Sequence, residues 1–201
     1  VAIRYAFAFP DVYEVGMSHL GSRILYDIIN KREDALCERV FMPWVDMADL
    51  MREEKVPLFS LETRSPIAGF DMLGVTLQYE MSYTNILNML RLAQVPLHAS
   101  DRKGLKNIVF AGGVCAFNPE PLADYIDFFS LGEGEDITPE ILRVYDTAKA
   151  EDWSKERFLK EVSRIPGVYV PCFYHHAYAS DGTLASVIAA DGAPGKITKR
   201  I

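Results

Sequence analysis

The sequence has few cysteines, no long apolar run and no excess of basic residues, and each absence excludes a class of protein. Its three cysteines stand at positions 37, 115 and 172, too far apart for a disulfide framework or a CxxxCxxC set of metal ligands. No apolar stretch approaches the roughly 18 to 20 residues that cross a bilayer, and the first residues lack the basic and apolar regions of a signal peptide. We therefore expect a protein of a reducing, cytoplasmic compartment without a membrane partner.

Charge and missing motifs exclude further functions. Twenty-eight acidic against 21 basic residues give a formal charge of −7, which repels a phosphate backbone, so nucleic acid is not an expected partner. The chain has no nucleophile elbow, no Ser/His/Asp arrangement of recognisable spacing and no paired carboxylates on one helix face. We predict neither catalytic residues nor a metal site within this chain.

What is present is the composition of a folded globular chain. Of its 201 residues, 49% are hydrophobic and 24% are charged, with a mean hydropathy of +0.02. This length fits one domain with a sizeable core, or one domain and a small appendage. Because the sequence lacks an initiator methionine and closes on basic residues without a terminating signal, we expect a fragment of a longer protein.

Short apolar runs alternate with amphipathic helical segments, a pattern typical of an α/β protein with a doubly wound parallel sheet. Expected strands cover 1–9, 36–42, 70–77, 107–111 and 128–131, with a small edge strand at 57–61. Ser18 can cap the first expected helix. Further helices are expected at 46–55, 82–93 and 140–149, and Thr138 and Pro139 are the expected cap and first-turn residues of the last one. In the 46–55 helix, Met47, Leu50 and Met51 are expected to face inward. The alternation predicts a five-stranded flavodoxin-like or Rossmann-like sheet of order 2-1-3-4-5.

The last quarter of the chain changes in pattern. Residues 154–164 form a charged amphipathic helix, and 169–179 and 183–190 alternate around Ser-Asp-Gly, as in a β-hairpin. We therefore expect an α/β domain over 1–150 and an appendage of a helix and a β-hairpin over 151–190. The glycine-rich and basic residues 191–201 are expected to be a linker toward a missing domain.

In a sheet of this order, ligands bind outside the carboxyl ends of the strands, where the strand order reverses between strands one and three. The loops at 10–18 and 78–84 would form that crevice. Their polar and aromatic residues exceed what a turn requires, so we predict binding residues among Asp11, Tyr13, Gly16, Ser18, His19, Thr76, Gln78, Tyr79 and Ser82. The structural alternative is that Ser18 and Ser82 cap helices, Gly16 makes a turn and the tyrosines pack. For His19, a general base, an axial metal ligand and a helix-start hydrogen bond all remain open.

Two glycine-bearing loops follow strands four and five. Gly112 and Gly113 allow positive φ and close approach of a ligand to the backbone, and the loop behind them carries Asn118. Gly132 and Glu133 begin a GEGE segment that lacks GxxxxGK and carries carboxylates that repel an anion. This second loop either contacts a ligand or forms the first turn of a helix, where acidic residues favour the helix dipole.

Four segments together resemble a known family. They are FPDVYEVGMSHLG at 9–21, ERVFMPWVDM at 38–47, LQYEMSYTNILNML at 77–90 and AGGVCAFNPEPLADYIDFFSLGEGE at 111–135. They resemble the N-terminal region of cobalamin-binding radical SAM proteins, most narrowly an uncharacterised bacterial subgroup. The resemblance implies a Rossmann-like cobalamin-binding domain that precedes a partial barrel. That barrel holds a [4Fe-4S] cluster through CxxxCxxC and cleaves S-adenosylmethionine. Because this chain has no such triplet, the resemblance implies that the Fe-S cluster and S-adenosylmethionine belong to a downstream domain of the same polypeptide.

The resemblance also frames the candidate cofactor site. Base-off cobalamin proteins carry DxHxxG after strand one; residues 11–16 keep that frame, but Tyr13 replaces the histidine, and a phenol is a poor cobalt ligand. Two hypotheses follow: a non-catalytic module that holds a corrinoid, or a degenerate Rossmann-like scaffold or interaction domain that binds no cobalamin. An open cavity above the glycine pair would favour the first, and Tyr13, Tyr79 and Tyr83 packed across it would favour the second. A free-standing receiver-like module fits less well, because no phospho-acceptor acidic cluster stands out.

Overall fold

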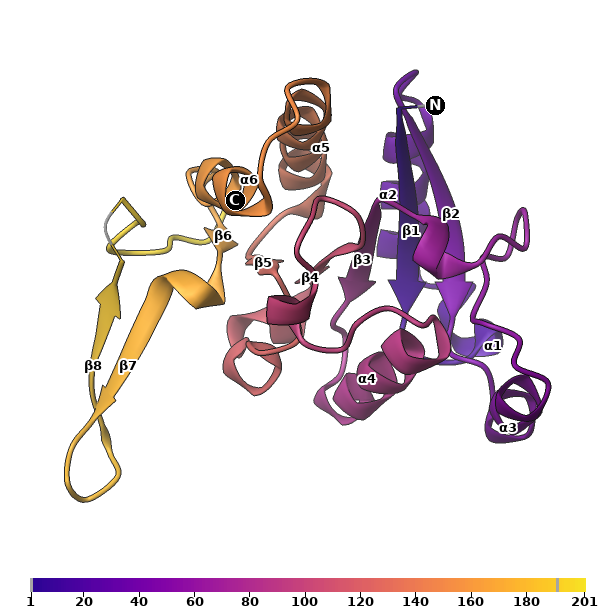
Figure 1. Cartoon of the computed structure of the whole chain (residues 1–201), viewed down its shortest axis with the longest axis horizontal. Helices are drawn as coiled ribbons and strands as arrows, with labels where there is room; N and C mark the ends of the chain where they lie inside the picture. Colours follow the sequence, from indigo (N-terminus) through magenta and orange to yellow (C-terminus); the bar gives the residue numbers. More distant parts are fainter. Residues whose placement is uncertain (1, 191) are drawn as a thin grey trace.

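The computed structural model describes residues 2–190 and 192–201, and in it the chain is an α/β protein built around one twisted sheet (Figure 1). The sheet has six strands in the order β2-β1-β3-β4-β5-β6. Its strands are β1 (Ile3–Phe9), β2 (Ala35–Phe41), β3 (Met72–Thr76), β4 (Ile108–Gly112), β5 (Phe128–Ser130) and β6 (Val168–Tyr169). The first five are parallel, which confirms the expected order, and β6 adds an antiparallel strand beside β5. Val1 of the expected first strand lies outside the described residues.

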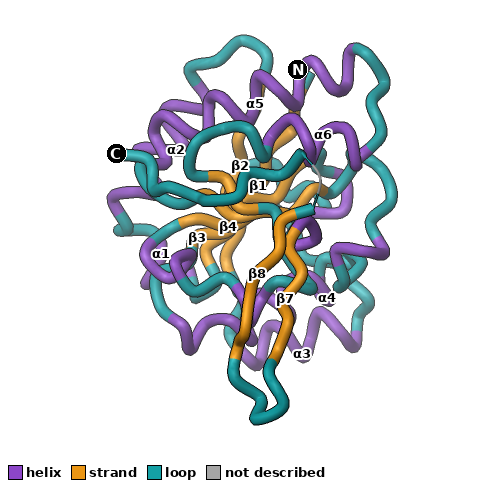
Figure 2. Tube along the Cα trace, turned by 90° about the vertical axis from the view of Figure 1, so that its left-hand side faces the viewer, coloured by secondary structure: helices purple, strands orange, loops and turns teal. Residues whose placement is uncertain are grey.

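Helices cover both faces of the sheet. They are α1 (Tyr13–Gly16), α2 (Leu20–Asn30), α3 (Val45–Glu53), α4 (Tyr83–Leu92), α5 (Gly134–Ala150) and α6 (Lys155–Val162). Ala6 and Ala8 of β1 share a core with α3 and α4, whereas Tyr5 and Phe7 share the other core with α2, α5 and α6. Figure 2 shows the sheet lying between these two helical layers. Burial on both faces explains why the strands are mainly apolar.

Two helices differ from expectation. In α3, Met47 and Leu50 are exposed and Ala48 and Met51 are buried, so the prediction for Met47 and Leu50 was wrong. The reason is that the helix starts at Val45 and turns positions 48 and 51, three residues apart, toward the sheet. In α5, the helix starts at Gly134, and Thr138 is buried within it instead of capping it. Acidic residues in its first turn favour this earlier start.

Residues 57–61 do not form a strand. Their only sheet-like pairing is an isolated bridge between Phe59 and Pro66. The segment is held instead by the buried carboxylate of Glu38 in β2, which accepts hydrogen bonds from Ser60 and Thr63. A side-chain anchor therefore replaces the expected edge strand.

The last quarter of the chain contains α6 and a hairpin. The expected helix is α6, which Ser154 caps by accepting from the Arg157 N–H, and its apolar face lies in the same core as α5. The hairpin consists of β7 (Tyr174–Tyr178) and β8 (Leu184–Ala189) and projects from the body (Figure 1). Tyr169 belongs to β6 in the main sheet, so the expected first hairpin strand is divided by the turn η6 (Pro171–Phe173). The domain boundary near residue 150 stays a prediction.

The end of the chain lies against the body. The Arg200 N–H donates to the Leu131 carbonyl at 2.9 Å, and its guanidinium pairs with Glu140 at 2.7 Å. Arg200 also makes a parallel bridge with Gly132. Residue 191 of the expected linker lies outside the described residues, and the linker role stays a prediction. None of the helices in the described ranges is long and apolar enough to cross a membrane.

Candidate ligand-binding crevice

A cavity opens at the carboxyl ends of the parallel strands. The chain leaves β1 toward β2 and leaves β3 toward β4, on opposite sides, so the two loops diverge and leave a crevice between neighbouring strands. The crevice leads into a cavity of about 180 Å3 between the sheet and helices α2 and α5. The predicted location of the site is therefore a real hollow.

The walls of the cavity combine aromatic rings with a few polar groups. Tyr5, Phe7 and Phe110 provide rings from β1 and β4. Five side chains contribute hydroxyl or amide groups: Tyr5, Thr76, Gln78, Ser130 and Thr138. The Gln78 amide donates to the Thr76 hydroxyl at 2.7 Å, which orients both groups at the end of β3. Such a mixture suits a flat, largely apolar group with a small number of hydrogen-bonding atoms.

Six glycines line the cavity, and two of them are required by backbone conformation. Gly113 has φ +109°, and a β-carbon there would lie 2.7 Å from the Leu77 carbonyl oxygen. Gly132 has φ +122°, and a β-carbon would overlap the Arg200 carbonyl oxygen. Both conformations are strained for any residue with a side chain, so these glycines bring bare backbone to the cavity.

The predicted site residues fall into two groups. Seven line the cavity: His19, Thr76, Gln78, Gly112, Gly113, Gly132 and Glu133. The other seven belong to the loops around its mouth or pack beneath them: Asp11, Tyr13, Gly16, Ser18, Tyr79, Ser82 and Asn118. The structure thus brings together residues from four separate loops, and their role in binding stays a prediction.

His19, and not Ser18, caps helix α2. The His19 Nδ1 accepts from the Ser22 N–H at 3.1 Å and lies 2.7 Å from the Ser22 hydroxyl, which contradicts the expectation for Ser18. The Ser18 hydroxyl reaches only back to the Val15 carbonyl, because the chain turns into the helix one residue later than expected. Of the roles left open for His19, the helix-start hydrogen bond is the one observed.

The Ser82 side chain does not cap α4 either. Its hydroxyl donates to the Tyr79 carbonyl at 2.7 Å and closes the short turn η2 (Glu80–Ser82). Because the chain enters α4 through this turn, Ser82 already has helical backbone angles and its side chain points back along the turn. Gly16 is buried between Phe9 and Phe41, where a β-carbon would lie within 2.7 Å of both rings.

The tyrosines of the crevice loops do not close the cavity. Tyr13 is 42% exposed and leans edge-on against Phe41, with ring centroids 5.3 Å apart. Tyr79 is 60% exposed. Tyr83 turns to the other side, where its hydroxyl donates to the Cys115 carbonyl at 3.1 Å. None of the three lines the cavity, which leaves its mouth open.

The segments that follow β1, β3 and β4, the strands whose carboxyl ends adjoin the cavity, carry exposed apolar side chains. Each of the following is more than 40% exposed: Tyr13, Met17, Leu20, Tyr79, Met81, Val114 and Phe117. Large exposed apolar surfaces of this kind mark contacts with ligands or partners. We call these residues the apolar rim.

Sequence analysis missed several wall residues. Gly74 in the middle of β3 and Ser130 at the end of β5 line the cavity, as does Leu25 of α2. A glycine inside a strand run indicates close approach to the backbone, so Gly74 could have been found from the sequence. Ser130 and Leu25 carry no such signal, because only the packing of α2 and α5 brings them together.

Burial keeps two ionisable side chains neutral, Tyr5 in the cavity wall and Cys115 in the segment after β4. Burial, and to a lesser degree Cys37, raises the pKa of the Tyr5 phenol, and burial followed by Glu80 raises the pKa of the Cys115 thiol. Both groups are therefore neutral at pH 7. Across the described part of the chain, no group of three or more His, Cys, Asp and Glu side chains is arranged to hold a metal ion.

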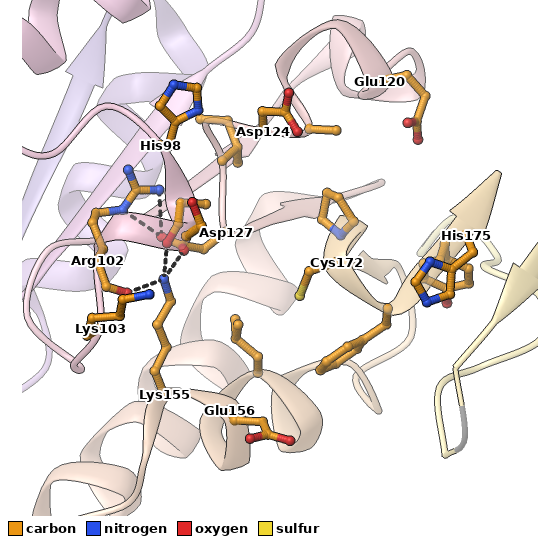
Figure 3. Close-up of a pocket in the computed structure, with 18 of the residues that line it drawn as sticks. His98, Arg102, Lys103, Glu120, Asp124, Asp127, Lys155, Glu156, Cys172 and His175 are labelled. Carbon is orange, nitrogen blue, oxygen red and sulfur yellow. Dashed lines mark hydrogen bonds and ion pairs between the residues drawn. The ribbon is translucent and has the colours of Figure 1, made fainter.

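A larger cleft of about 700 Å3 lies between the body and the base of the hairpin (Figure 3). At its floor, Asp127 lies between Arg102, at 3.0 Å, and Lys155, at 2.5 Å. Lys155 also donates to the Ala99 and Arg102 carbonyls, so its hydrogen-bonding capacity is filled by the protein. This ion cluster joins α6 to the loop before β4 and is structural.

Comparison with known proteins agrees with the fold. The family described as radical SAM proteins, N-terminal, matches residues 21–171. An uncharacterized protein of Methanocaldococcus jannaschii, MJ0966, is 27% identical over 141 residues, which are 68% of this chain and 26% of that protein. The chain thus spans about a quarter of the length of this relative.

Solved structures share the fold at low sequence identity. The cobalamin-dependent S-adenosylmethionine radical enzyme OxsB with aqua-cobalamin bound aligns with a TM-score of 0.52 at 14% identity, over 96% of this chain and 24% of OxsB. The OxsB structure with both aqua-cobalamin and S-adenosylmethionine gives 0.50 at 13% identity over the same shares. Because the family match covers most of the sequence, this chain belongs to the N-terminal family of radical SAM proteins.

Proposed function

We propose that this chain is the corrinoid-binding module of a longer radical SAM protein and performs no chemistry by itself. The observation that carries the proposal is the open cavity at the β1/β3 crevice, which ends on the backbone of Gly112 and Gly113 and is not crossed by the nearby tyrosines. The fold neighbour OxsB, whose structure was solved with aqua-cobalamin bound, supports the choice of ligand.

The dimensions of the cavity suit one end of a corrinoid. About 180 Å3 is below the roughly 300 to 1,000 Å3 of pockets that hold a whole drug-sized ligand, so only part of the molecule would enter. The rings of Phe7 and Phe110 suit the flat base of its nucleotide tail. The broad corrin ring would then rest on the apolar rim.

The charges at the mouth suit the amide groups of a corrin. Glu133 and Glu135 line the cavity where α5 begins, and carboxylates accept hydrogen bonds from amide N–H groups. The neutral Gln78 and Thr76 at the opposite wall can donate or accept. This arrangement therefore suits the amide side chains around a corrin ring.

We further propose that neither Tyr13 nor His19 ligates cobalt. Tyr13 leans on Phe41 outside the cavity. The Nδ1 of His19 accepts a hydrogen bond from the Ser22 N–H, which places the proton of the neutral ring on Nε2 and leaves that nitrogen no lone pair for cobalt. A bound corrinoid supplies cobalt-centred chemistry, while the residues of this chain hold its tail, orient its ring and exclude water from the buried end.

The remaining cofactors are proposed to lie outside this chain. Cys37, Cys115 and Cys172 are free and far apart in sequence, and we propose that the [4Fe-4S] cluster and S-adenosylmethionine bind the radical SAM barrel of the same polypeptide. A reducing cytoplasmic setting fits three free thiols.

The test is corrinoid retention by the full-length natural protein. The protein is mixed with hydroxocobalamin, reduced or not, and passed through gel filtration, and the absorbance of the corrinoid in the protein peak is measured. Leu25→Trp fills the cavity from α2 and should lower retention at least about tenfold, whereas the matched Leu25→Ala enlarges the cavity and should keep it. Absence of corrinoid from the wild-type peak in both oxidation states would overturn the proposal and leave the scaffold hypothesis.

A further inference from the structure

The β7–β8 hairpin is exposed over most of both faces. Its two strands pair only with each other within the described structure, and its tip reaches beyond the rest of the chain in both views (Figures 1 and 2). A two-stranded ribbon is marginally stable in water unless a third strand or another element covers it. The hairpin therefore needs a surface that this chain does not provide.

Its composition is that of a buried element. Among residues 174–190, Asp181 at the turn is the only charged side chain, although 24% of the whole chain is charged. Tyr178, Leu184, Val187 and Ile188 are between 48% and 67% exposed. Exposed strand edges in soluble proteins usually carry charges, in particular lysine, that oppose association, and this hairpin carries none along its strands.

The strand register divides the hairpin into two different faces. Tyr174 pairs with Ala189, His176 with Val187 and Tyr178 with Leu184, and these side chains share one face, which we call the aromatic face. The opposite face carries the pairs His175 with Ile188 and Ala177 with Ser186. The aromatic face is the more apolar of the two and offers the larger contact area.

The base of the aromatic face is fixed to the body, and its outer half is free. The Tyr174 hydroxyl donates to the Pro194 carbonyl at 2.7 Å, and its ring lies 5.0 Å from that of Tyr169. His176 Nε2 lies 3.6 Å from a carboxylate oxygen of Glu120. The cleft of Figure 3 lies at this base. Farther out, Tyr178, Leu184 and Val187 are 67%, 53% and 48% exposed.

We infer that the aromatic face of the β7–β8 hairpin docks on the radical SAM domain of the longer polypeptide. The inference rests on the proposed function, which places this chain in such a protein. This chain matches only 26% of the length of its relative MJ0966, so most of a protein of that kind lies outside it. A domain of the same polypeptide is always present at high effective concentration, and an uncharged apolar face suits such a permanent contact.

Hydrogen–deuterium exchange of the full-length protein tests the inference. The backbone amides of peptides covering 174–190 should exchange at least about tenfold more slowly than those of a hairpin with no covering domain, because docking suppresses the local unfolding that exposes them to solvent. Val187→Lys places a charge on the aromatic face and should speed this exchange about tenfold, whereas the matched control Ile188→Lys on the opposite face should change it less than about twofold.

Three outcomes would overturn the docking inference. The first is that the wild-type hairpin exchanges at the rate of an unstructured peptide, and the second is that the two lysine substitutions have equal effects. The third is that protection disappears on dilution, which would assign the aromatic face to a contact with a second copy of the protein. Corrinoid retention is measured on the same samples. If corrinoid is retained but the hairpin is not protected from exchange, only the docking inference is overturned. If the hairpin is protected but no corrinoid is retained, docking is supported and only corrinoid binding is overturned.

Discussion

The hydroxyl of Tyr5 on β1 occupies the space in which a side chain at position 74 on β3 would lie. A β-carbon on Gly74 would overlap that oxygen, and the Tyr5 ring packs edge-on against Phe110 with centroids 5.9 Å apart. The two residues stand on the neighbouring strands at which the chain order reverses. One wall of the cavity thus depends on an absent side chain.

We expect Gly74→Ala to destabilise the protein by about 1 to 3 kcal/mol, the usual cost of overpacking a core. Tyr5→Phe in the Gly74→Ala background should recover part of that loss, since it removes the atom that approaches most closely. Urea unfolding of the two single variants and the double variant measures the coupling. Strict additivity of the two free-energy changes would contradict the contact.

Asp127 balances two buried cations, and its charge should be essential for folding. Asp127 and Arg102 are each 1% exposed at the side chain, and the Lys155 ammonium lies 2.5 Å from the second carboxylate oxygen. That oxygen accepts no well-aligned hydrogen bond and is balanced by the ammonium charge alone. Asp127→Asn should therefore cost about 3 to 5 kcal/mol, measured by urea or thermal unfolding.

An exposed ion pair provides the control for Asp127. Asp27 and Lys31 are 60% and 74% exposed at the side chain, so Asp27→Asn should change the stability by less than about 1 kcal/mol. Equal effects of the two substitutions would show that burial of the Asp127 cluster does not matter.

Glu38 should make stability depend on pH in the acid range. Burial alone would raise the pKa of this carboxyl, but hydrogen bonds from Ser60, Thr63 and Arg4 outweigh it and lower the pKa. The carboxylate therefore stabilises the fold above the unfolded pKa, about 4.3. This contribution is lost as the pH falls through the lowered pKa of the folded state.

Glu38→Gln should flatten this pH dependence. At pH 7 the variant should be less stable by about 1 to 3 kcal/mol, and the difference from wild type should shrink on acidification below about pH 4. Urea unfolding at several pH values measures both effects. Glu161→Gln, in the exposed pair with Arg164, should leave the wild-type curve unchanged, and parallel curves for Glu38→Gln would contradict the assignment.

His19 should matter for helix α2 and not for a metal. His19→Ala should cost about 1 kcal/mol through loss of the cap, and His19→Asn should restore most of it, because asparagine caps well. In the corrinoid-loaded full-length protein, both variants should keep the wild-type electron paramagnetic resonance spectrum of cob(II)alamin. Loss of nitrogen hyperfine splitting in His19→Asn would show that His19 binds cobalt after all.

The order of the sheet could be predicted because the strands are mainly apolar and helical segments alternate with them, a pattern typical of a parallel sheet covered on both faces. β6 was missed because two residues, Val168 and Tyr169, carry no period of their own, and only pairing with β5 makes them a strand. The inward face of α3 was wrong for a similar reason. The sequence pattern favours both Met47 and Met51 as core residues, but Met47 is exposed and Met51 is buried, because the helix that starts at Val45 turns position 51 toward the sheet.

The same division holds for the crevice. The loops after β1, β3, β4 and β5 could be selected from the sequence, because parallel strands bring all their carboxyl ends to one edge. Which of their residues face the cavity could not, since Tyr13 and Tyr79 turn outward while Thr76 and Gln78 turn inward. Loop side chains have no period, so their direction depends on contacts such as that of Tyr13 with Phe41.

By itself, the sequence determined the class of fold, the strand order and the edge of the sheet at which the cavity lies, because these follow from local patterns of apolar residues and glycines. Only the tertiary structure decided that the cavity is open, that His19 caps a helix and that the hairpin is exposed over most of both faces. Each of these depends on distances between residues far apart in the chain, which packing alone sets.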